Sequence, residues 1–418
     1  MARLSPSSTK EASEEGYEIR HRGRKMKSVY LLGAVRTPIG RFGGSLAQHS
    51  AAELGSIVAR ESLRRAHIDP AAVREVIWGS ARQAGLGPNV ARQIAYRAGL
   101  SEEIPAYTVN QACGSGLKAI ILAAQEIMLG RASIVLAGGV ETMSRVPYLV
   151  EGARWGLRMG HAELSDAMYR DGFLDPLSGM LMGETAEKLA QIYAISREEQ
   201  DAFALRSQKR AAEAIGTGRF EAEIVPVEIK GPRGEPELFS HDEHPRPDTT
   251  LEALRKLPPV FAKDGTVTAG NSSGITDGAA AIVVADETAV ERMGLRPQGR
   301  VVDYEIVGVA PDLMGIGPVP AVRNLLERQK LSLDEIDLVE LNEAFAAQVI
   351  ACDRELQFDP ERLNVNGGAI ALGHPIGCTG TRIVVTLLHE MGRRRARRGL
   401  ATLCVSGGMG LALLVEAP

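Results

Sequence analysis

Cys113 is the residue of this chain best placed to act as a nucleophile. It stands in the stretch Val-Asn-Gln-Ala-Cys113-Gly-Ser-Gly, and apolar residues recur at helical spacing from Leu117 to Met128. The pattern predicts a turn between an extended segment and the start of a helix. A thiol at a helix N-terminus lies at the positive end of the peptide dipoles, which favours the reactive thiolate. A small buried filler is the alternative role for a cysteine between Ala and Gly.

Three further side chains could complete a site around Cys113. His374 lies in Gly-His374-Pro-Ile-Gly, and an imidazole there could take the thiol proton and form an ion pair with the thiolate. Cys404 ends an apolar stretch at a glycine turn, where its thiol could point into the same cleft. Asn342 follows another apolar stretch and offers an amide donor. These residue types predict nucleophilic catalysis by a thiol.

The elements that must position these residues occur twice, at a period of roughly 260 residues. Val109 and Val365 each precede an Asn and open a glycine-rich turn, and an amphipathic helix and an apolar strand follow each turn. Apolar strands that alternate with helices indicate buried sheets covered by helices. Packing of the two halves is expected to bring the turns of Cys113 and His374 face to face.

A segment rich in charge and methionine separates the two halves. It contains a helical run from Glu184 to Ala214, which Ser196 and Glu199 restart with a capping box. We expect this insert to grip the substrate. The predicted division is a disordered tail 1–25, a first half 26–143 completed by 271–296, an inserted loop domain 144–270, and a second half 297–418, with Met26 as an alternative start.

Composition excludes several classes of function. The net charge is −4 and aromatic residues make up 4%, so neither nucleic acid nor an anionic membrane surface is expected as a partner. The four cysteines show no CxxC spacing and no pattern of metal ligands with histidine, so no metal site is expected. Free thiols in a chain of this length favour a reducing compartment, and we expect the cytoplasm.

The chain resembles the thiolase family, the acetyl-CoA acetyltransferases and 3-ketoacyl-CoA thiolases, from about Lys27 to Leu414. Five motifs in order across both halves make this resemblance specific. They are Val-Asn-Gln-Ala-Cys-Gly-Ser-Gly at 109–116, Thr-Ala-Gly-Asn-Ser-Ser-Gly at 268–274, Asn-Glu-Ala-Phe-Ala-Ala-Gln at 342–348, Asn-Val-Asn-Gly-Gly-Ala-Ile-Ala-Leu-Gly-His-Pro at 364–375 and Leu-Cys-Val-Ser-Gly-Gly-Met-Gly at 403–410.

The resemblance implies an α/β thiolase fold, with a duplicated five-layer αβαβα core and an inserted loop domain. It also implies reversible Claisen condensation of acetyl-CoA to acetoacetyl-CoA, or thiolytic cleavage of 3-ketoacyl-CoA, by a ping-pong mechanism. Coenzyme A would be substrate and product, and no separate cofactor is expected. Such enzymes serve fatty acid metabolism, including β-oxidation, as homodimers or homotetramers.

The resemblance assigns a role to each motif. Cys113 would carry the acyl group as a thioester. His374 would activate it and, with Asn342 through a bound water, would stabilise one oxyanion. Cys404 would be the second acid or base, and the backbone N–H groups of Cys113 and Ser406 would form the second oxyanion hole. Binding of CoA and the acyl group would fall to Ser273, Arg246, Met182, Leu181, Ala344 and Phe345.

Two positions depart from the family pattern. Leu181 stands where the acetoacetyl-specific branch tends to have a histidine that lines the acyl pocket, which leaves the preferred acyl length open. Ser406 stands where a glycine is usual, and its side chain could narrow the turn after Cys404.

Two other functions compete with a thiolase. A ketosynthase-type condensing enzyme would share the duplicated fold and act on carrier-protein substrates, but such enzymes lack a second cysteine like Cys404. A non-catalytic acyl-CoA-binding or lipid-binding relative would need none of Cys113, Asn342, His374 and Cys404. The presence of all four favours the enzyme.

Overall fold

The computed structural model describes residues 27–231 and 233–418. The predicted tail at 1–25 and the alternative start at Met26 lie outside the described residues. The first half contains β1 (Val29–Arg36), β2 (Gly40–Arg41), α1 (Ala51–Ala66), β3 (Glu75–Gly79), α2 (Val90–Arg97), β4 (Ala106–Val109), α3 (Ser115–Met128), β5 (Ile134–Thr142) and, after the insert, β10 (Thr276–Asp286) and α7 (Glu287–Met293).

The second half repeats this order of elements. It contains β11 (Gly299–Gly308), α8 (Pro318–Gln329), β12 (Leu338–Leu341), α9 (Ala346–Leu356), α10 (Ala369–Leu372), α11 (Ile376–Arg394), β13 (Arg398–Val405) and β14 (Met409–Glu416). Hydrogen bonds link the strands in the order β12-β13-β14-β11-β1-β10-β5-β3-β4. The halves meet where β11 pairs antiparallel with the beginning of β1, from Val29 to Leu31.

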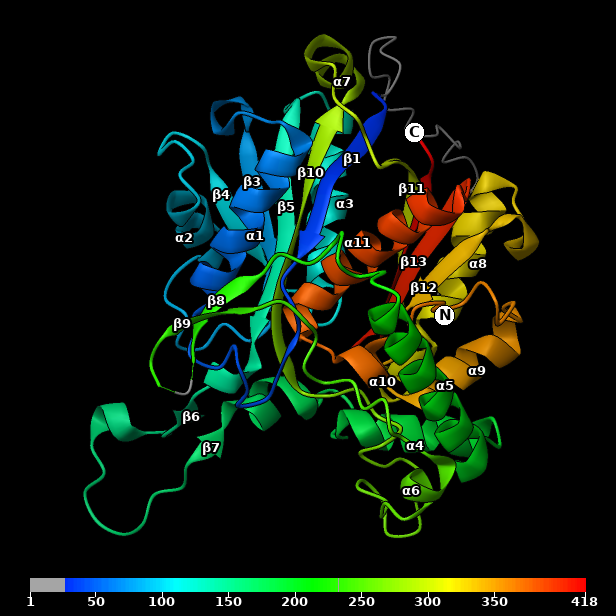
Figure 1. Cartoon of the computed structure of the whole chain (residues 1–418). Helices are drawn as coiled ribbons and strands as arrows, with labels where there is room; N and C mark the ends of the chain where they lie inside the picture. Colours follow the sequence, from blue (N-terminus) through cyan, green and yellow to red (C-terminus); the bar gives the residue numbers. More distant parts are fainter. Residues whose placement is uncertain (1–26, 232) are drawn as a thin grey trace, which may run out of the picture.

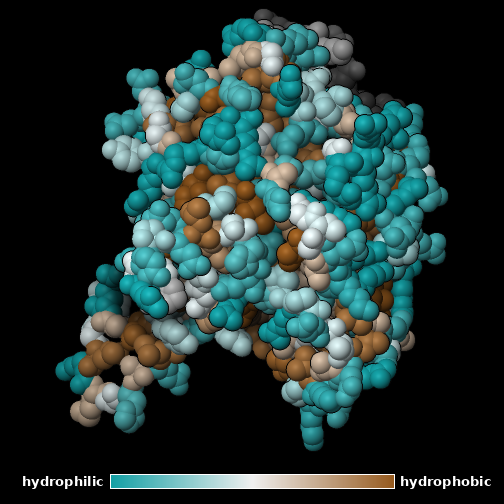
Figure 2. Space-filling view, viewed as in Figure 1, coloured by the Kyte–Doolittle hydropathy of each residue, from teal (hydrophilic) through white to brown (hydrophobic). Residues whose placement is uncertain are grey.

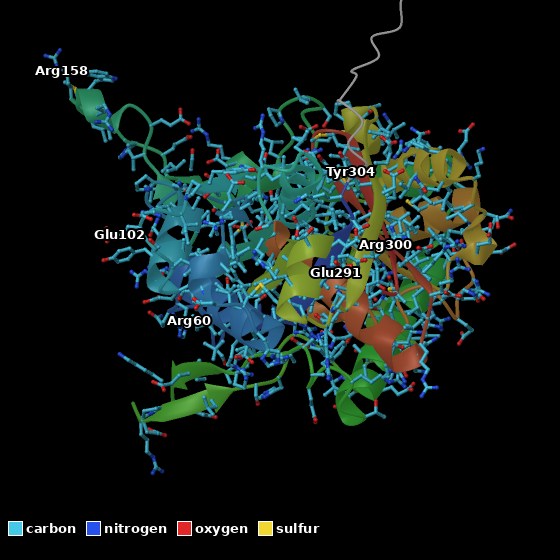
Figure 3. All side chains as sticks on the ribbon, turned by 90° about the horizontal axis from the view of Figure 1, so that it is seen from above. Arg60, Glu102, Arg158, Glu291, Arg300 and Tyr304 are labelled. Atoms are coloured by element: carbon cyan, nitrogen blue, oxygen red, sulfur yellow. The ribbon has the colours of Figure 1, made fainter. Side chains whose placement is uncertain are left out.

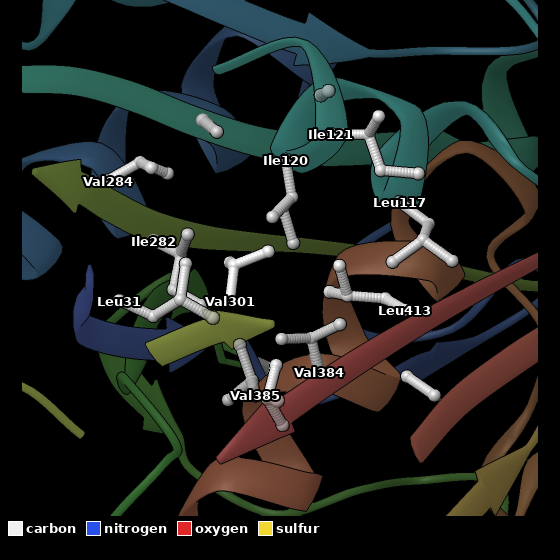
Figure 4. Close-up of a cluster of buried hydrophobic side chains, with 14 of the residues drawn as sticks. Leu31, Leu117, Ile120, Ile121, Ile282, Val284, Val301, Val384, Val385 and Leu413 are labelled. Atoms are coloured by element: carbon white, nitrogen blue, oxygen red, sulfur yellow. The ribbon is translucent and has the colours of Figure 1, made fainter. Parts of the chain in front are cut away.

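Alternating apolar residues along the strands build three core layers. One face of β1 and β10 places Leu31 and Ile282 in a central cluster with Leu117 of α3, Val384 of α11 and Leu413 of β14 (Figure 4). The opposite face of β1 and β10 belongs to an outer cluster under α1 and α2, and a second outer cluster joins β12, β13 and β14 to α8 and α9. This arrangement of helix, sheet, helix pair, sheet and helix confirms the predicted five-layer αβαβα core (Figure 1).

Glycines let α3 and α11 approach each other closely in the central layer. A Cβ on Gly116 would lie 2.7 Å from the backbone nitrogen of Thr381, and a Cβ on Gly380 would collide with Leu117. Gly116 is the second residue of α3 and Gly380 the fifth residue of α11. Their contact brings together the helix N-termini, where the turns of Cys113 and His374 lie.

Residues between β5 and β10 form the inserted part of the chain. They contain β6 (Tyr148–Leu149), β7 (Ser165–Asp166), α4 (Met182–Ile192), α5 (Arg197–Gly216), β8 (Val227–Lys230), β9 (Pro236–Phe239) and α6 (Leu251–Arg255). The predicted capping box is present, since the Glu199 N–H donates to the Ser196 hydroxyl at 3.2 Å and the Ser196 N–H to the Glu199 carboxylate at 2.7 Å.

A buried ion pair fixes this insert to the first half. The Arg36 guanidinium on β1 donates to Glu223 at 2.5 Å and to both carboxylate oxygens of Asp242, at 2.6 and 2.9 Å. Residues 148–166, which we call the arm, extend away from the body instead (Figure 1). Arg158 lies at its far end (Figure 3), and its surface is largely apolar (Figure 2), with Trp155 and Met159 86% and 97% exposed.

Within the described part of the chain, every helix is too short or too polar to cross a membrane.

Candidate active site

The turns of Cys113 and His374 lie against the same cavity. Cys113 is two residues before the first residue of α3, and His374 is two residues before the first residue of α11. Ala112 has a φ of 44°, a left-handed backbone that turns the chain sharply from β4 into Cys113. The two turns are therefore matching parts of the duplicated halves, as the sequence repeat predicts.

The cavity has a volume of about 540 Å³ and gathers most of the predicted site residues. Those that line it are Cys113, Leu181, Met182, Arg246, Ser273, Ala344, Phe345, His374, Cys404 and Ser406. Asn342 is the exception, because it lies buried behind the imidazole, with its Nδ2 3.5 Å from Nε2 of His374. The insert contributes Leu181, Met182 and Arg246, so it forms one wall of the cavity.

A hydrogen-bond chain sets the tautomer of His374. Nδ1 of His374 lies 2.6 Å from the Thr379 hydroxyl, and that hydroxyl donates its one proton to the Pro375 carbonyl at 3.0 Å. The hydroxyl therefore accepts the Nδ1 proton, which leaves Nε2 with a lone pair. An imidazole held in this form can take a proton from Cys113.

Thr379→Val should lower the kcat/KM of the reaction catalysed in this cavity by roughly 10- to 100-fold. The substitution leaves the buried Nδ1–H of His374 without an acceptor, so the imidazole is no longer held in the tautomer with a lone pair on Nε2. Thr379→Ser keeps the hydroxyl and should retain most of the activity. Steady-state kinetics of both variants test this, and a Val variant that is as active as the Ser variant would show that the hydrogen bond does not matter.

Burial determines the charge of both groups at rest. Burial raises the pKa of Cys113, although Arg82 and the backbone N–H groups of Ser406 and Cys113 lower it. Burial and the positive charges of Arg382 and Arg82 lower the pKa of His374 to about 3. Both groups are therefore neutral near pH 7, because desolvation outweighs the helix dipole, and the ion pair of thiolate and imidazolium that the sequence allows is not the resting state.

This neutral imidazole predicts a pH dependence of stability. Between the ordinary pKa of 6.5 and about 3, the unfolded chain binds a proton on this residue that the folded chain does not, so acid destabilises the fold. When the pH falls from about 7 to about 5, the Tm of the His374→Asn variant should fall by less than the Tm of the unmodified protein. The exposed His161→Asn serves as the control and should leave this difference unchanged.

Cys404 lies deep in the cavity, at the next-to-last residue of β13. It is 1% exposed, and burial together with the neighbouring Cys113 raises its pKa well above the ordinary value. At neutral pH the thiol of Cys404 holds its proton and can donate it to a carbanion.

The turn after Cys404 directs a backbone donor at the nucleophile. Gly407 and Gly408 have φ values of 84° and 82°, and a Cβ on Gly408 would collide with the Val309 carbonyl. This turn points the Ser406 N–H, together with that of Cys113, at the Cys113 sulfur. Ser406 itself is half-buried, so its side chain is accommodated where the family pattern has glycine.

A second hollow of about 320 Å³ adjoins the main cavity. The two share His244, Arg246 and Ala269 in their walls. Nδ1 of His244 donates to the Ala371 carbonyl at 2.8 Å, and burial lowers the pKa of this imidazole. A long, thin ligand could therefore extend from Cys113 past Arg246.

Sequence reasoning missed three residues of this site. Thr379 is five positions after His374, and His244 and Arg82 belong to no motif that the sequence analysis used. Thr379 is about one and a half helical turns beyond His374, and this short separation is the signal in the sequence that could have drawn attention to it. His244 and Arg82 reach the cavity from the insert and from the loop after β3, so nothing in their spacing indicates it.

Comparisons with known proteins agree with this arrangement. The sequence matches the family profiles "Thiolase, N-terminal domain" over residues 29–288 and "Thiolase, C-terminal domain" over residues 295–417. It is 52% identical over 395 residues to an acetyl-CoA acetyltransferase of Syntrophomonas wolfei, which covers 94% of this chain and 99% of the relative. It is also 52% identical over 392 residues to the Escherichia coli acetyl-CoA acetyltransferase, with coverage of 94% and 99%.

Solved structures of similar proteins share the fold. The acetyl-CoA acetyltransferase of Bacillus anthracis superposes with a TM-score of 0.92 at 48% identity, over 94% of this chain and 99% of that one. A human mitochondrial 3-ketoacyl-CoA thiolase in complex with CoA superposes with a TM-score of 0.91 at 43% identity, over 94% and 98%.

Proposed function

The chain belongs to the thiolase family, and on that premise we propose that it is an acyl-CoA:acetyl-CoA C-acyltransferase. It condenses two acetyl-CoA molecules to acetoacetyl-CoA, and in reverse it cleaves a 3-ketoacyl-CoA with CoA. The observation that carries the proposal is the placement of Cys113, His374 and Cys404 around one cavity, with two backbone N–H groups directed at the Cys113 sulfur.

Cleavage begins with the proton on Cys113. Nε2 of His374 takes it as the sulfur attacks the 3-keto carbon, and the N–H groups of Cys113 and Ser406 hold the oxygen that becomes negative. The bond between carbons 2 and 3 then breaks. Its electron pair passes into the acetyl-CoA enolate, and the acyl group stays on Cys113 as a thioester.

Cys404 completes the first half-reaction. Its thiol gives a proton to carbon 2 of the enolate and acetyl-CoA leaves. In this proposal the enolate oxygen is stabilised by His374, now protonated on Nε2, and through a bound water by Asn342, whose amide lies beside the imidazole. In the second half-reaction, the Cys404 thiolate takes the proton of the CoA thiol as the CoA sulfur attacks the thioester on Cys113. Acyl-CoA is then released, and His374 returns its proton to the Cys113 sulfur.

The adjoining hollow supports a binding mode for CoA. The pantetheine group of CoA would lie along Ser273. The Ser273 N–H donates to the Ala344 carbonyl at 3.0 Å, which joins the loop before β10 to Ala344 and Phe345. Arg246 lies where the cavity meets the hollow and would contact the nucleotide phosphates. Leu181 and Met182 would border the acyl group, and the apolar Leu181 makes that end of the cavity less polar than a histidine would.

Other parts of the proposal concern organisation. We propose the domain division 26–143 with 271–296, 144–270 and 297–418, because β10 returns from the insert to pair between β1 and β5. The large apolar surface of the arm supports a homodimer or homotetramer. Four free thiols support a cytoplasmic enzyme of fatty acid metabolism, whether synthetic or β-oxidative.

Thiolysis tests the proposed function directly. Purified protein is mixed with CoA and either acetoacetyl-CoA or longer 3-ketoacyl-CoA substrates, and loss of the 3-ketoacyl-CoA is followed. Peptide mass spectrometry of the protein mixed with acetyl-CoA alone should show an acetyl group on Cys113. Turnover of carrier-protein substrates without CoA thiolysis would favour the ketosynthase alternative, and absence of both would favour a binding protein.

A further inference from the structure

Arg82 brings a buried positive charge to the wall of the cavity. It is 6% exposed and lies in the loop after β3, three residues beyond Gly79. β3 and β4 are parallel neighbours, so the loop that carries Arg82 and the turn that carries Cys113 leave the sheet at the same edge. Both residues line the cavity.

The guanidinium of Arg82 has no partner among the described residues. No carboxylate at 27–231 or 233–418 lies within 4.0 Å of the Arg82 nitrogens. No side chain or carbonyl in these ranges accepts a hydrogen bond from the guanidinium of Arg82. The nearby Glu141 is already engaged, because its oxygens accept the N–H groups of Ala81, Arg82 and Gly377 at 3.1, 3.0 and 2.8 Å. Glu141 therefore acts on the Arg82 guanidinium through its charge at a distance and not through a hydrogen bond, which leaves the guanidinium N–H groups free to bind an anion.

The surroundings of Arg82 identify the part of the substrate that would reach it. Ala81, Met143 and Ile376 form one apolar cluster, against which Cys113 and Phe173 pack. A Cβ on Gly172 would collide with the Arg82 guanidinium, so this glycine leaves room for it in the cavity wall. An acyl chain attached to the Cys113 sulfur would have an apolar path bordered by this cluster, with the Arg82 guanidinium beside it.

We propose that Arg82 is a specificity-determining residue that binds a terminal carboxylate on the acyl chain, so that the preferred substrates are 3-ketoacyl-CoA thioesters of dicarboxylic acids. The fork of guanidinium N–H groups matches the two oxygens of a carboxylate. This inference rests on the proposed function, because it names the acyl group that Cys113 carries.

Paired substrates test the proposal on the unmodified enzyme. One is a 3-ketoacyl-CoA whose chain ends in a carboxylate, and the other has a carboxamide of the same size in its place. We expect kcat/KM to favour the carboxylate by roughly 10- to 100-fold. Equal rates, or preference for the carboxamide, would overturn the proposal without any variant. Failure to cleave either substrate or acetoacetyl-CoA would overturn the proposed function and this inference with it.

Variants locate the effect on one side chain. Arg82→Met should bring the ratio of the two kcat/KM values close to one, and Arg82→Lys should restore part of it. Arg41→Met is the matched control, because Arg41 lines the same cavity but is 67% exposed beside Glu243, so it should change both substrates alike. Equal losses on both substrates in Arg82→Met would mean that Arg82 acts on Cys113 instead, and would overturn the proposal.

Discussion

Cys113→Ala should lower thiolysis of 3-ketoacyl-CoA by about 10⁴-fold or more, because it removes the sulfur that forms the acyl thioester. The fold should survive, since the side chain is half-buried and alanine fills most of its volume. Acetyl-CoA should no longer label the protein at this position. Steady-state thiolysis and peptide mass spectrometry measure the two effects.

Cys378→Ala is a matched control for this variant. Cys378 is another thiol near the start of α11, it is buried, and it does not line the cavity. This control should keep its activity and its acetyl label. Unchanged turnover in Cys113→Ala, or a label that moves to another cysteine, would contradict the assignment of the nucleophile.

Cys404→Ala should separate the two chemical tasks of the site. Transfer of an acetyl group from acetyl-CoA to Cys113 breaks no carbon–carbon bond, so it needs only Cys113, His374 and the N–H donors. Proton transfer at carbon 2 needs Cys404, and its loss should cost roughly 10²- to 10⁴-fold in thiolysis. The variant should therefore still become acetylated while exchange of the acetyl-CoA methyl protons with deuterated water disappears.

The acetylation reaction serves as the internal control for folding in this variant. NMR of acetyl-CoA in deuterated water follows the exchange. Normal exchange would show that another base reaches carbon 2, and would remove Cys404 from the mechanism. Loss of acetylation as well would mean that Cys404 supports the Cys113 site as a whole.

The duplication made the pairing of Cys113 with His374 predictable. The two halves have the same order of helices and strands, so they pack with their corresponding turns facing each other. A histidine at the position that corresponds to Cys113 therefore lies opposite Cys113. The glycines that allow this contact, Gly116 and Gly380, lie within the repeated helices. Apolar periodicity indicated buried sheets covered by helices, and capping indicated the restart of the helix at Ser196, whereas the number of layers came from the family resemblance.

The charge states were not predictable in the same way. The thiolate expected at Cys113 assumed that the helix dipole acts on a hydrated thiol. The fold instead removes water from Cys113 and His374 together, and desolvation of a charged group outweighs a dipole of half a charge. Burial depends on every element that surrounds a side chain, so it cannot be read from neighbours in sequence.

The sequence by itself determined the family, the layered fold and the side chains that face one another across the two turns, because repeats and motifs are local patterns. Only the tertiary structure decided that the proton rests on Cys113 and that Thr379 fixes the lone pair of His374 toward the cavity. The tertiary structure alone also placed Arg82 in the same wall, where no group among residues 27–231 and 233–418 accepts a hydrogen bond from its guanidinium. These properties arise because the fold excludes water from the site and brings together loops that are far apart in sequence. Neither effect can be read from a single position of the sequence.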